Sequence, residues 1–131
     1  MEKTKILIVE DECIIADDIA NVLRKKNYEI IGICPSGKKA LEAIEKRIPD
    51  LVLMDIMIKG DIDGVQTADL IKEKIDAPVI YLTAFTDDNT IQRARITDPF
   101  GYILKPFEER ELYTNIEMAL YKHKAVVETK N

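Results

Sequence analysis

The segment Lys5-Ile6-Leu7-Ile8-Val9-Glu10-Asp11-Glu12 joins an apolar run directly to three acidic residues. Its four consecutive apolar side chains, three of them β-branched, are typical of a strand that is covered on both faces, as strands of parallel sheets are. In open parallel sheets, ligands bind beyond the carboxyl ends of the strands. The segment therefore predicts a central strand of an α/β protein with a polar site beyond its end.

Apolar runs and helical patterns alternate along the rest of the chain. Further strand-like runs cover residues 28–33, 51–54, 79–82 and 101–104. Apolar residues at helical spacing cover residues 14–23, 40–48, 65–75 and 112–120, and a weaker pattern surrounds Ile91 and Ala94. This alternation predicts five βα units, with helices on both faces of a parallel sheet. We expect a doubly wound (βα)5 α/β fold with the flavodoxin-like strand order 2-1-3-4-5.

Length and composition indicate one domain with an aliphatic core. The chain has 131 residues, of which 47% are hydrophobic and 6% aromatic. We assign residues 1–124 to the domain and residues 125–131 to a polar tail or the start of a linker. The formal net charge of −5 argues against broad electrostatic binding to nucleic acid or to an anionic membrane. Because no apolar stretch is long enough for a signal segment or a membrane span, we expect a cytoplasmic protein.

Chemically active side chains follow four of the predicted strands. Glu10 and Asp11 follow the first strand, Asp55 ends the third, Thr83 follows the fourth and Lys105 follows the fifth. In the strand order 2-1-3-4-5 the first and third strands are neighbours, so their carboxylates should share one cleft. Each residue alone has an ordinary explanation, as an acidic helix turn, a turn former, a cap or a solvated charge. Their placement on one edge of one sheet favours a site.

The combination suits phosphoryl chemistry. Clustered carboxylates repel one another unless a cation or a proton compensates, and hard oxygen ligands of this kind suit Mg²⁺, with Mn²⁺ as an alternative. A carboxylate can also act as a nucleophile and form an aspartyl-phosphate. A lysine and a threonine hydroxyl at the same cleft could bind phosphoryl oxygens. In-line phosphoryl transfer to a carboxylate requires such a set of a metal ion, a nucleophile, a cation and a hydrogen-bond donor.

These residues, with their neighbours, resemble the receiver domain of two-component response regulators, a CheY-like fold. The matching stretches are residues 5–12, 55–57, 63–64, 78–84 and 101–107. The resemblance extends from about Lys5 to Tyr121, which is nearly the whole chain. Each motif is common by itself, whereas the ordered set is specific.

The resemblance implies a phosphoacceptor and a metal site. Asp55 would accept a phosphoryl group from the phosphohistidine of a histidine kinase. Glu10 and Asp11 would hold Mg²⁺, together with Asp55 and the backbone carbonyl of Met57. The domain would then catalyse its own phosphorylation and slow dephosphorylation, without turnover of small substrates.

The resemblance also implies a switch. Thr83 would move toward the phosphoryl group, the backbone N–H of Ala84 would help to bind it, and Lys105 would pair with a phosphoryl oxygen. Tyr102 would turn inward when Thr83 moves, although a strand tyrosine is more often simply packed. The Lys105–Pro106 peptide bond is expected to be cis.

The expected output is a change of surface at helix 4, strand 5 and helix 5. The implied partners are a sensor histidine kinase or phosphotransfer protein, a downstream effector protein or domain, and a second copy of the chain through that surface. No direct contact with nucleic acid or with a membrane is expected.

The segment after the proposed phosphoacceptor departs from the family pattern, and a residue after Thr83 is expected to affect dephosphorylation. Lys59 stands where family members commonly have a proline, and the segment 59–64 is one residue longer than usual. Phe85 stands two residues after Thr83, at a position that often affects dephosphorylation in this family. We predict that Phe85 hinders the attacking water and slows hydrolysis.

Three other classes of function fit the sequence less well. A receiver-like scaffold or dimerisation module that works without phosphorylation would often lack one member of the acidic, threonine and lysine set. A flavodoxin-like FMN carrier would need a phosphate loop in place of Glu10, Asp11 and Glu12. A phosphatase with an aspartate nucleophile commonly has an Asp-x-Asp general acid, but Met57 occupies that second position.

Overall fold

Five parallel strands form one sheet in the computed structural model of the chain, which describes residues 3–83 and 101–130. The strands are β1 (Lys5–Val9), β2 (Glu29–Cys34), β3 (Leu51–Asp55), β4 (Val79–Thr83) and β5 (Gly101–Leu104). Their order in the sheet is β2-β1-β3-β4-β5. This confirms the predicted fold class and strand order.

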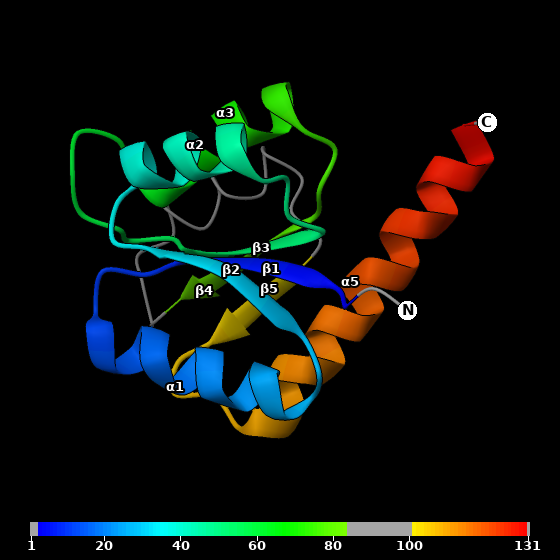
Figure 1. The fold of residues 1–131 in the computed structure, drawn as a ribbon, viewed down its shortest axis with the longest axis horizontal. Helices are drawn as coiled ribbons and strands as arrows, with labels where there is room; N and C mark the ends of the chain where they lie inside the picture. The colour runs from blue at the N-terminus through cyan, green and yellow to red at the C-terminus, as the bar shows by residue number, and fades with distance from the viewer. Residues whose placement is uncertain (1–2, 84–100, 131) are drawn as a thin grey trace.

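Helices cover both faces of the sheet (Figure 1). They are α1 (Cys13–Lys25), α2 (Gly37–Lys46), α3 (Gly64–Lys74) and α5 (Glu109–Lys130). Figure 1 shows α2 and α3 together above the sheet, with α1 and the first half of α5 below it. The weak helical pattern around Ile91 and Ala94 lies outside the described residues.

Alternate side chains of each strand enter two separate cores. Ile6 and Ile8 pack on the side of α1 and α5, whereas Leu7 and Val9 pack on the side of α2 and α3. All four are fully buried. Because both faces are covered, no polar residue is needed within β1, which explains its uninterrupted apolar sequence. No helix in the described ranges combines the length and apolarity that a membrane crossing requires.

Three details of the helical predictions need correction. Ile14, placed by its spacing on the apolar face of α1, is 87% exposed, while the adjacent Ile15 packs against the core. Ile48 is 64% exposed because α2 ends at Lys46, and Pro49 disfavours helical backbone at the preceding residue. Helix α5 continues to Lys130, beyond the helical pattern of residues 112–120 and into the predicted polar tail, since no glycine or proline interrupts it.

Candidate functional site

Three carboxylates meet at the carboxyl edge of the sheet. β1 and β3 are neighbours in register, with Val9 opposite Met54, so the residues that follow them are brought together. Carboxylate oxygens of Glu10, Asp11 and Asp55 all lie within 4.8 Å of one another. The juxtaposition predicted from the strand order is therefore confirmed.

Backbone amides fix two of these carboxylates. The N–H of Glu12 donates to Oε1 of Glu10 at 3.1 Å, and the N–H of Met57 donates to Oδ1 of Asp55 at 3.0 Å. Glu10 is 2% exposed and Asp55 is 5% exposed, whereas Asp11 is only partly buried. Two acidic groups are thus held in place close to each other with little access to bulk water.

Lys105 bridges the two buried carboxylates. Its Nζ lies 2.7 Å from Oε2 of Glu10 and 3.4 Å from Oδ2 of Asp55. The backbone N–H of Lys105 donates to the carbonyl of Thr83 at 2.7 Å, which anchors the β5–α5 connection to the end of β4. The Lys105–Pro106 peptide bond is cis, as the family resemblance implied.

The titration behaviour of the site follows from burial and proximity. Burial raises the pKa of Glu10 from 4.5 to about 7, although the hydrogen bond from Lys105 acts in the opposite direction. Burial lowers the pKa of Lys105, but the two carboxylates outweigh this effect and the net pKa is raised. Lys105 is therefore a firmly charged cation between two carboxyl groups, one of which gains a proton readily in the absence of a metal.

The donor set fits a hard divalent cation. Mg²⁺ takes oxygen ligands and retains several waters, and a pair or triad of carboxylates at one open edge supplies such ligands. Among the described residues, Glu10, Asp11 and Asp55 form the acidic cluster with metal-binding spacing. The contribution of the Met57 carbonyl stays a prediction.

The predicted switch residues lie on β4 and β5. Thr83 is buried at the end of β4, next to the strand that carries Asp55. Tyr102 on β5 is partly exposed, and its ring centroid lies 5.9 Å from that of the fully buried Tyr81. Ala84 and Phe85 lie outside the described residues, so their predicted roles are not tested.

Sequence reasoning missed the tyrosine pair. Tyr81 and Tyr102 are register partners on adjacent strands, and directly opposed aromatic side chains on neighbouring strands interact. Tyr81 stands two residues before Thr83, whereas Tyr102 stands three residues before Lys105, so only the register between β4 and β5 shows that the two lie opposite each other. The pair gives Tyr102 a packed partner in the present conformation.

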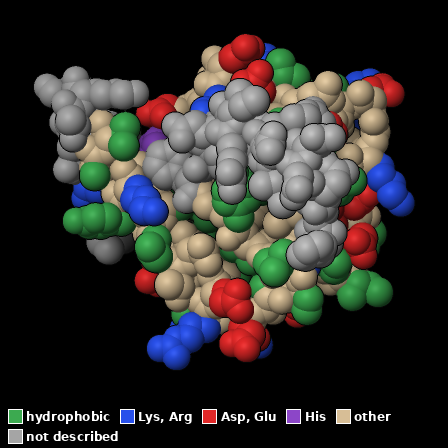
Figure 2. Space-filling view, turned by 180° about the vertical axis from the view of Figure 1, so that it is seen from behind, with side chains coloured by type: hydrophobic (Ala, Val, Ile, Leu, Met, Phe, Trp, Pro, Cys, Tyr) green, Lys and Arg blue, Asp and Glu red, His purple; other side chains and the backbone are tan. Residues whose placement is uncertain are grey.

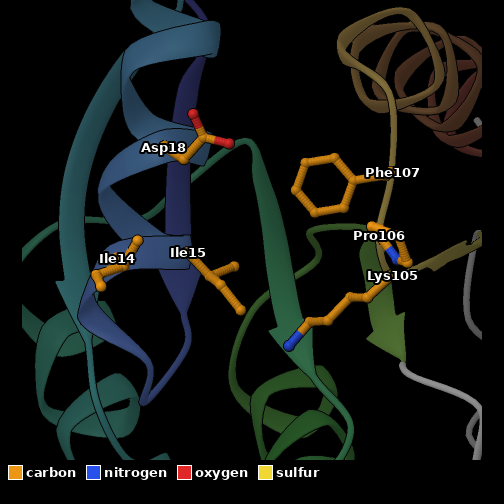
Figure 3. Close-up of a pocket in the computed structure, with 6 residues that line it drawn as sticks. All are labelled: Ile14, Ile15, Asp18, Lys105, Pro106 and Phe107. Carbon is orange, nitrogen blue, oxygen red and sulfur yellow. The ribbon is translucent and has the colours of Figure 1, made fainter.

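An apolar pocket lies next to the site, between α1 and the β5–α5 connection (Figure 3). Its volume is about 520 Å³, and its lining residues are Ile14, Ile15, Asp18, Lys105, Pro106 and Phe107. Figure 3 shows the Lys105 side chain extending away from the Phe107 ring, with its ammonium at the end of a strand. No sequence pattern indicates this pocket, because its walls come from segments near opposite ends of the chain.

Comparison with known proteins agrees with this geometry. The family model described as "Response regulator receiver domain" matches residues 6–117. The transcriptional regulatory protein PdtaR of Mycobacterium tuberculosis is 38% identical over 122 residues, which are 93% of this chain and 59% of PdtaR. The transcriptional regulatory protein YvrH of Bacillus subtilis is 36% identical over 120 residues, or 92% of this chain and 50% of YvrH. The chain thus spans only about half to three fifths of these curated relatives.

Two solved structures show the same fold over nearly their whole length. The signal receiver domain of a modulated diguanylate cyclase from Desulfovibrio desulfuricans G20 aligns with a TM-score of 0.90 at 35% identity, covering 95% of this chain and 98% of that one. The N-terminal domain of a response regulator/sensory box/GGDEF protein from Carboxydothermus hydrogenoformans aligns with a TM-score of 0.87 at 41% identity, covering 95% and 99%.

The doubly wound fold and the acidic edge define a CheY-like signalling domain. The chain belongs to the response regulator receiver domain family of two-component systems.

Proposed function

We propose that this receiver domain is a Mg²⁺-dependent phosphoryl switch in which Asp55 is the phosphoacceptor. The observation that supports the proposal best is the contact of the Lys105 ammonium with both Asp55 and Glu10 inside a three-carboxylate cluster. A nucleophilic carboxylate, a metal-binding acidic pair and a fixed cation are the parts that phosphoryl transfer to aspartate needs.

The proposed reaction starts at an Asp55 carboxylate oxygen. As this oxygen forms its bond to phosphorus, the P–N bond of a donor phosphohistidine breaks and its electron pair returns to the imidazole nitrogen. Bound Mg²⁺, held by Glu10, Asp11, Asp55 and the Met57 carbonyl, would supply charge neutralisation for the transferred group. Lys105 would then pair with a phosphoryl oxygen, since its ammonium already lies 3.4 Å from Asp55 Oδ2.

The switch itself is proposed to pass through Thr83. The Thr83 hydroxyl and the Ala84 N–H would bind the remaining phosphoryl oxygens, and Tyr102 would move inward behind Thr83. This would bias an equilibrium between two surfaces at the predicted helix 4, β5 and α5. Phe85, two residues after Thr83 in the sequence, would slow the attack of water on the aspartyl-phosphate.

The proposed partners follow from this chemistry. The phosphoryl donor is a sensor histidine kinase or a phosphotransfer protein in the cytoplasm. The receiver surface acts on a downstream effector protein or domain, or on a second copy of the chain. Because the curated relatives are longer than this chain, these partners are proposals for the whole protein.

Intact mass after incubation with acetyl phosphate and Mg²⁺ tests the proposal. We expect one phosphoryl adduct, which disappears when EDTA replaces Mg²⁺ and in the variant Asp55→Asn. If no adduct forms, phosphotransfer from a panel of phosphorylated histidine kinases is the deciding measurement. Absence of transfer from every kinase to folded, Mg²⁺-bound protein would reject the switch and favour a scaffold that works without phosphorylation.

A further inference from the structure

Tyr81 is the largest fully buried side chain among the described residues. It lies on β4 and belongs to the core between the sheet and the helices α2 and α3. None of the other described members of that core carries an aromatic ring. The neighbours of this ring therefore indicate what an aromatic side chain provides at this position that an aliphatic one would not.

Tyr81, Thr83 and Tyr102 lie on one face of the sheet. Successive side chains of a strand point to opposite faces, so Tyr81 and Thr83, two positions apart, share a face. Tyr102 is the register partner of Tyr81 on β5, and because the two rings are in contact it points to that face as well. The intervening Leu82 and its register partner Ile103 belong to the opposite core. Tyr102 thus lies directly beside Tyr81 and two residues along the strands from the level of Thr83.

The protein encloses the two rings to different degrees. Tyr81 is flanked on its other side by β3, where its register partner Met54 is fully buried in the same core. Tyr102 lies on β5, the last strand in the sheet order, and is 38% exposed. Figure 1 shows β5 behind β1 and β2, and hydrophobic side chains (green) are visible at the surface in the view from behind in Figure 2. A ring in a close-packed core has one position, whereas a half-exposed ring has room for another.

The contact between the rings has the geometry of a favourable aromatic pair. The ring centroids lie 5.9 Å apart, and the ring planes are inclined by 32°. Aromatic pairs with centroids about 4.5–7 Å apart contribute stabilisation beyond the area that they bury. Because the enclosed Tyr81 ring cannot follow, a turn of Tyr102 toward Thr83 would change this geometry and lose part of that stabilisation.

We propose that Tyr81 is a positioning residue for Tyr102. Its buried ring holds Tyr102 in the half-exposed orientation and so sets how readily Tyr102 turns inward. One aromatic pair makes the inward orientation about two- to tenfold rarer than it would be beside an aliphatic residue. The inference rests on the proposed function in one respect, since the inward movement of Tyr102 is part of the proposed phosphoryl switch. The contact itself needs no phosphoryl group, so it can be tested without phosphorylation.

Fluorine NMR of the full chain labelled with 3-fluorotyrosine tests the positioning role. The Tyr102 signal is identified by its loss in Tyr102→Phe, and its shift between H₂O and D₂O reports the exposure of the ring. In metal-free, unphosphorylated protein, we expect a smaller solvent shift in Tyr81→Leu than in the wild type. The reason is that the ratio of inward to outward orientations rises about two- to tenfold when the aromatic partner is lost. An unchanged or larger solvent shift in Tyr81→Leu would overturn the proposal.

Two further variants separate the ring contact from a loss of stability. Tyr81→Phe retains the ring and removes only the hydroxyl, so its Tyr102 signal should match that of the wild type. Leu82→Ala leaves a cavity in the opposite core and should destabilise the domain without changing the Tyr102 solvent shift. Urea unfolding verifies that each variant is folded, and Tyr81→Ile replaces Tyr81→Leu if the latter does not fold. A Tyr102 signal altered equally in Leu82→Ala, or altered in Tyr81→Phe, would overturn the role of the ring.

The rate of phosphoryl adduct formation shows whether Tyr81 acts through Tyr102. With acetyl phosphate and Mg²⁺, Tyr81→Leu should form the adduct about two- to tenfold faster than the wild type, because the inward orientation is more populated at the start. In a Tyr102→Leu background the same substitution should leave the rate unchanged, since the partner ring is already absent. A full effect of Tyr81→Leu without the Tyr102 ring would overturn the proposal. If no variant forms an adduct, the proposed phosphoryl switch fails, while the fluorine measurement still decides the role of Tyr81.

Discussion

The ammonium of Lys105 lies closer to Glu10 than to Asp55, at 2.7 Å against 3.4 Å, although 95 residues separate Lys105 from Glu10. The lysine thus neutralises the proposed metal ligand as well as the proposed phosphoacceptor. Binding of a divalent cation by Glu10 would release the ammonium from that carboxylate. Lys105 would then be available to pair with a phosphoryl oxygen on Asp55. We therefore expect metal binding and phosphorylation to be coupled.

The first prediction concerns this lysine. Lys105→Met removes the cation while keeping much of the side-chain length. We expect phosphorylation by acetyl phosphate to slow about 100-fold, the scale on which loss of one preorganised electrostatic donor acts. The time course of the phosphoryl adduct by intact mass measures the effect. Lys38→Met, an exposed lysine on α2, is the control, and equal rates for both variants would contradict the role of Lys105.

The second prediction concerns metal binding. Added Mg²⁺ should raise the thermal unfolding temperature, because the folded chain holds three carboxylates together and the unfolded chain does not. At a concentration 100 times the dissociation constant, the stabilisation is about 2.7 kcal/mol. Asp11→Asn should remove most of the effect, while Asp17→Asn on the exposed side of α1 should retain it. An equal Mg²⁺ response in both variants would argue against the acidic cluster as the site.

The third prediction concerns pH in the absence of metal. The pKa of Glu10 is raised from 4.5 to about 7 in the folded protein by burial, so the folded chain binds an additional proton between these values. The binding of this proton by the folded chain contributes to stability. The contribution is complete below the pKa that Glu10 has in the unfolded chain, and it is lost as the pH rises through about 7. In EDTA, the free energy of unfolding by urea should therefore decrease from pH 5 to pH 8.

Glu10→Gln provides the control for that measurement. The amide has a similar shape and does not titrate, so most of the decrease between pH 5 and pH 8 should disappear. Excess Mg²⁺ should also reduce the decrease in the wild type, because the metal favours the deprotonated carboxylate. A pH profile that is the same in wild type and Glu10→Gln would assign the decrease to other groups.

The strand order explains why so much of the site could be predicted. Once β1 and β3 were expected to be neighbours, Glu10 and Asp55 had to meet at the edge where parallel strands end. The same geometry placed Thr83 and Lys105 beside them. These inferences needed only the alternation of apolar runs and the identity of the residues that follow each run.

The remaining details depend on packing that the sequence pattern does not encode. The spacing of Ile14 suggested a buried helix face, yet the sheet covers only part of α1. The stronger contact of Lys105 with Glu10 depends on side-chain rotamers and on local burial. The Tyr81–Tyr102 contact depends on register between β4 and β5, which apolar runs alone do not fix.

The last prediction concerns Gly64, the first residue of α3. A Cβ at this position would collide with the backbone carbonyl of Asp55 and would lie 2.8 Å from Cα of Ile56. Asp63 caps α3 with its side chain. Gly64, the next residue, therefore packs directly on the backbone that carries the proposed phosphoacceptor. Gly64→Ala should destabilise the domain by about 3 kcal/mol, the upper part of the range for overpacking.

Gly101 offers a matched comparison at the start of β5. A Cβ there would lie 3.8 Å from its nearest neighbour, Oδ1 of Asn115, so Gly101→Ala should change stability by no more than about 0.5 kcal/mol. Urea unfolding measures both variants. Because the collision at Gly64 involves the Asp55 backbone, folded Gly64→Ala should also form the phosphoryl adduct more slowly than Gly101→Ala. Equal stability of the two variants would show that the backbone at Asp55 can shift without cost, and that α3 does not hold the acceptor in place.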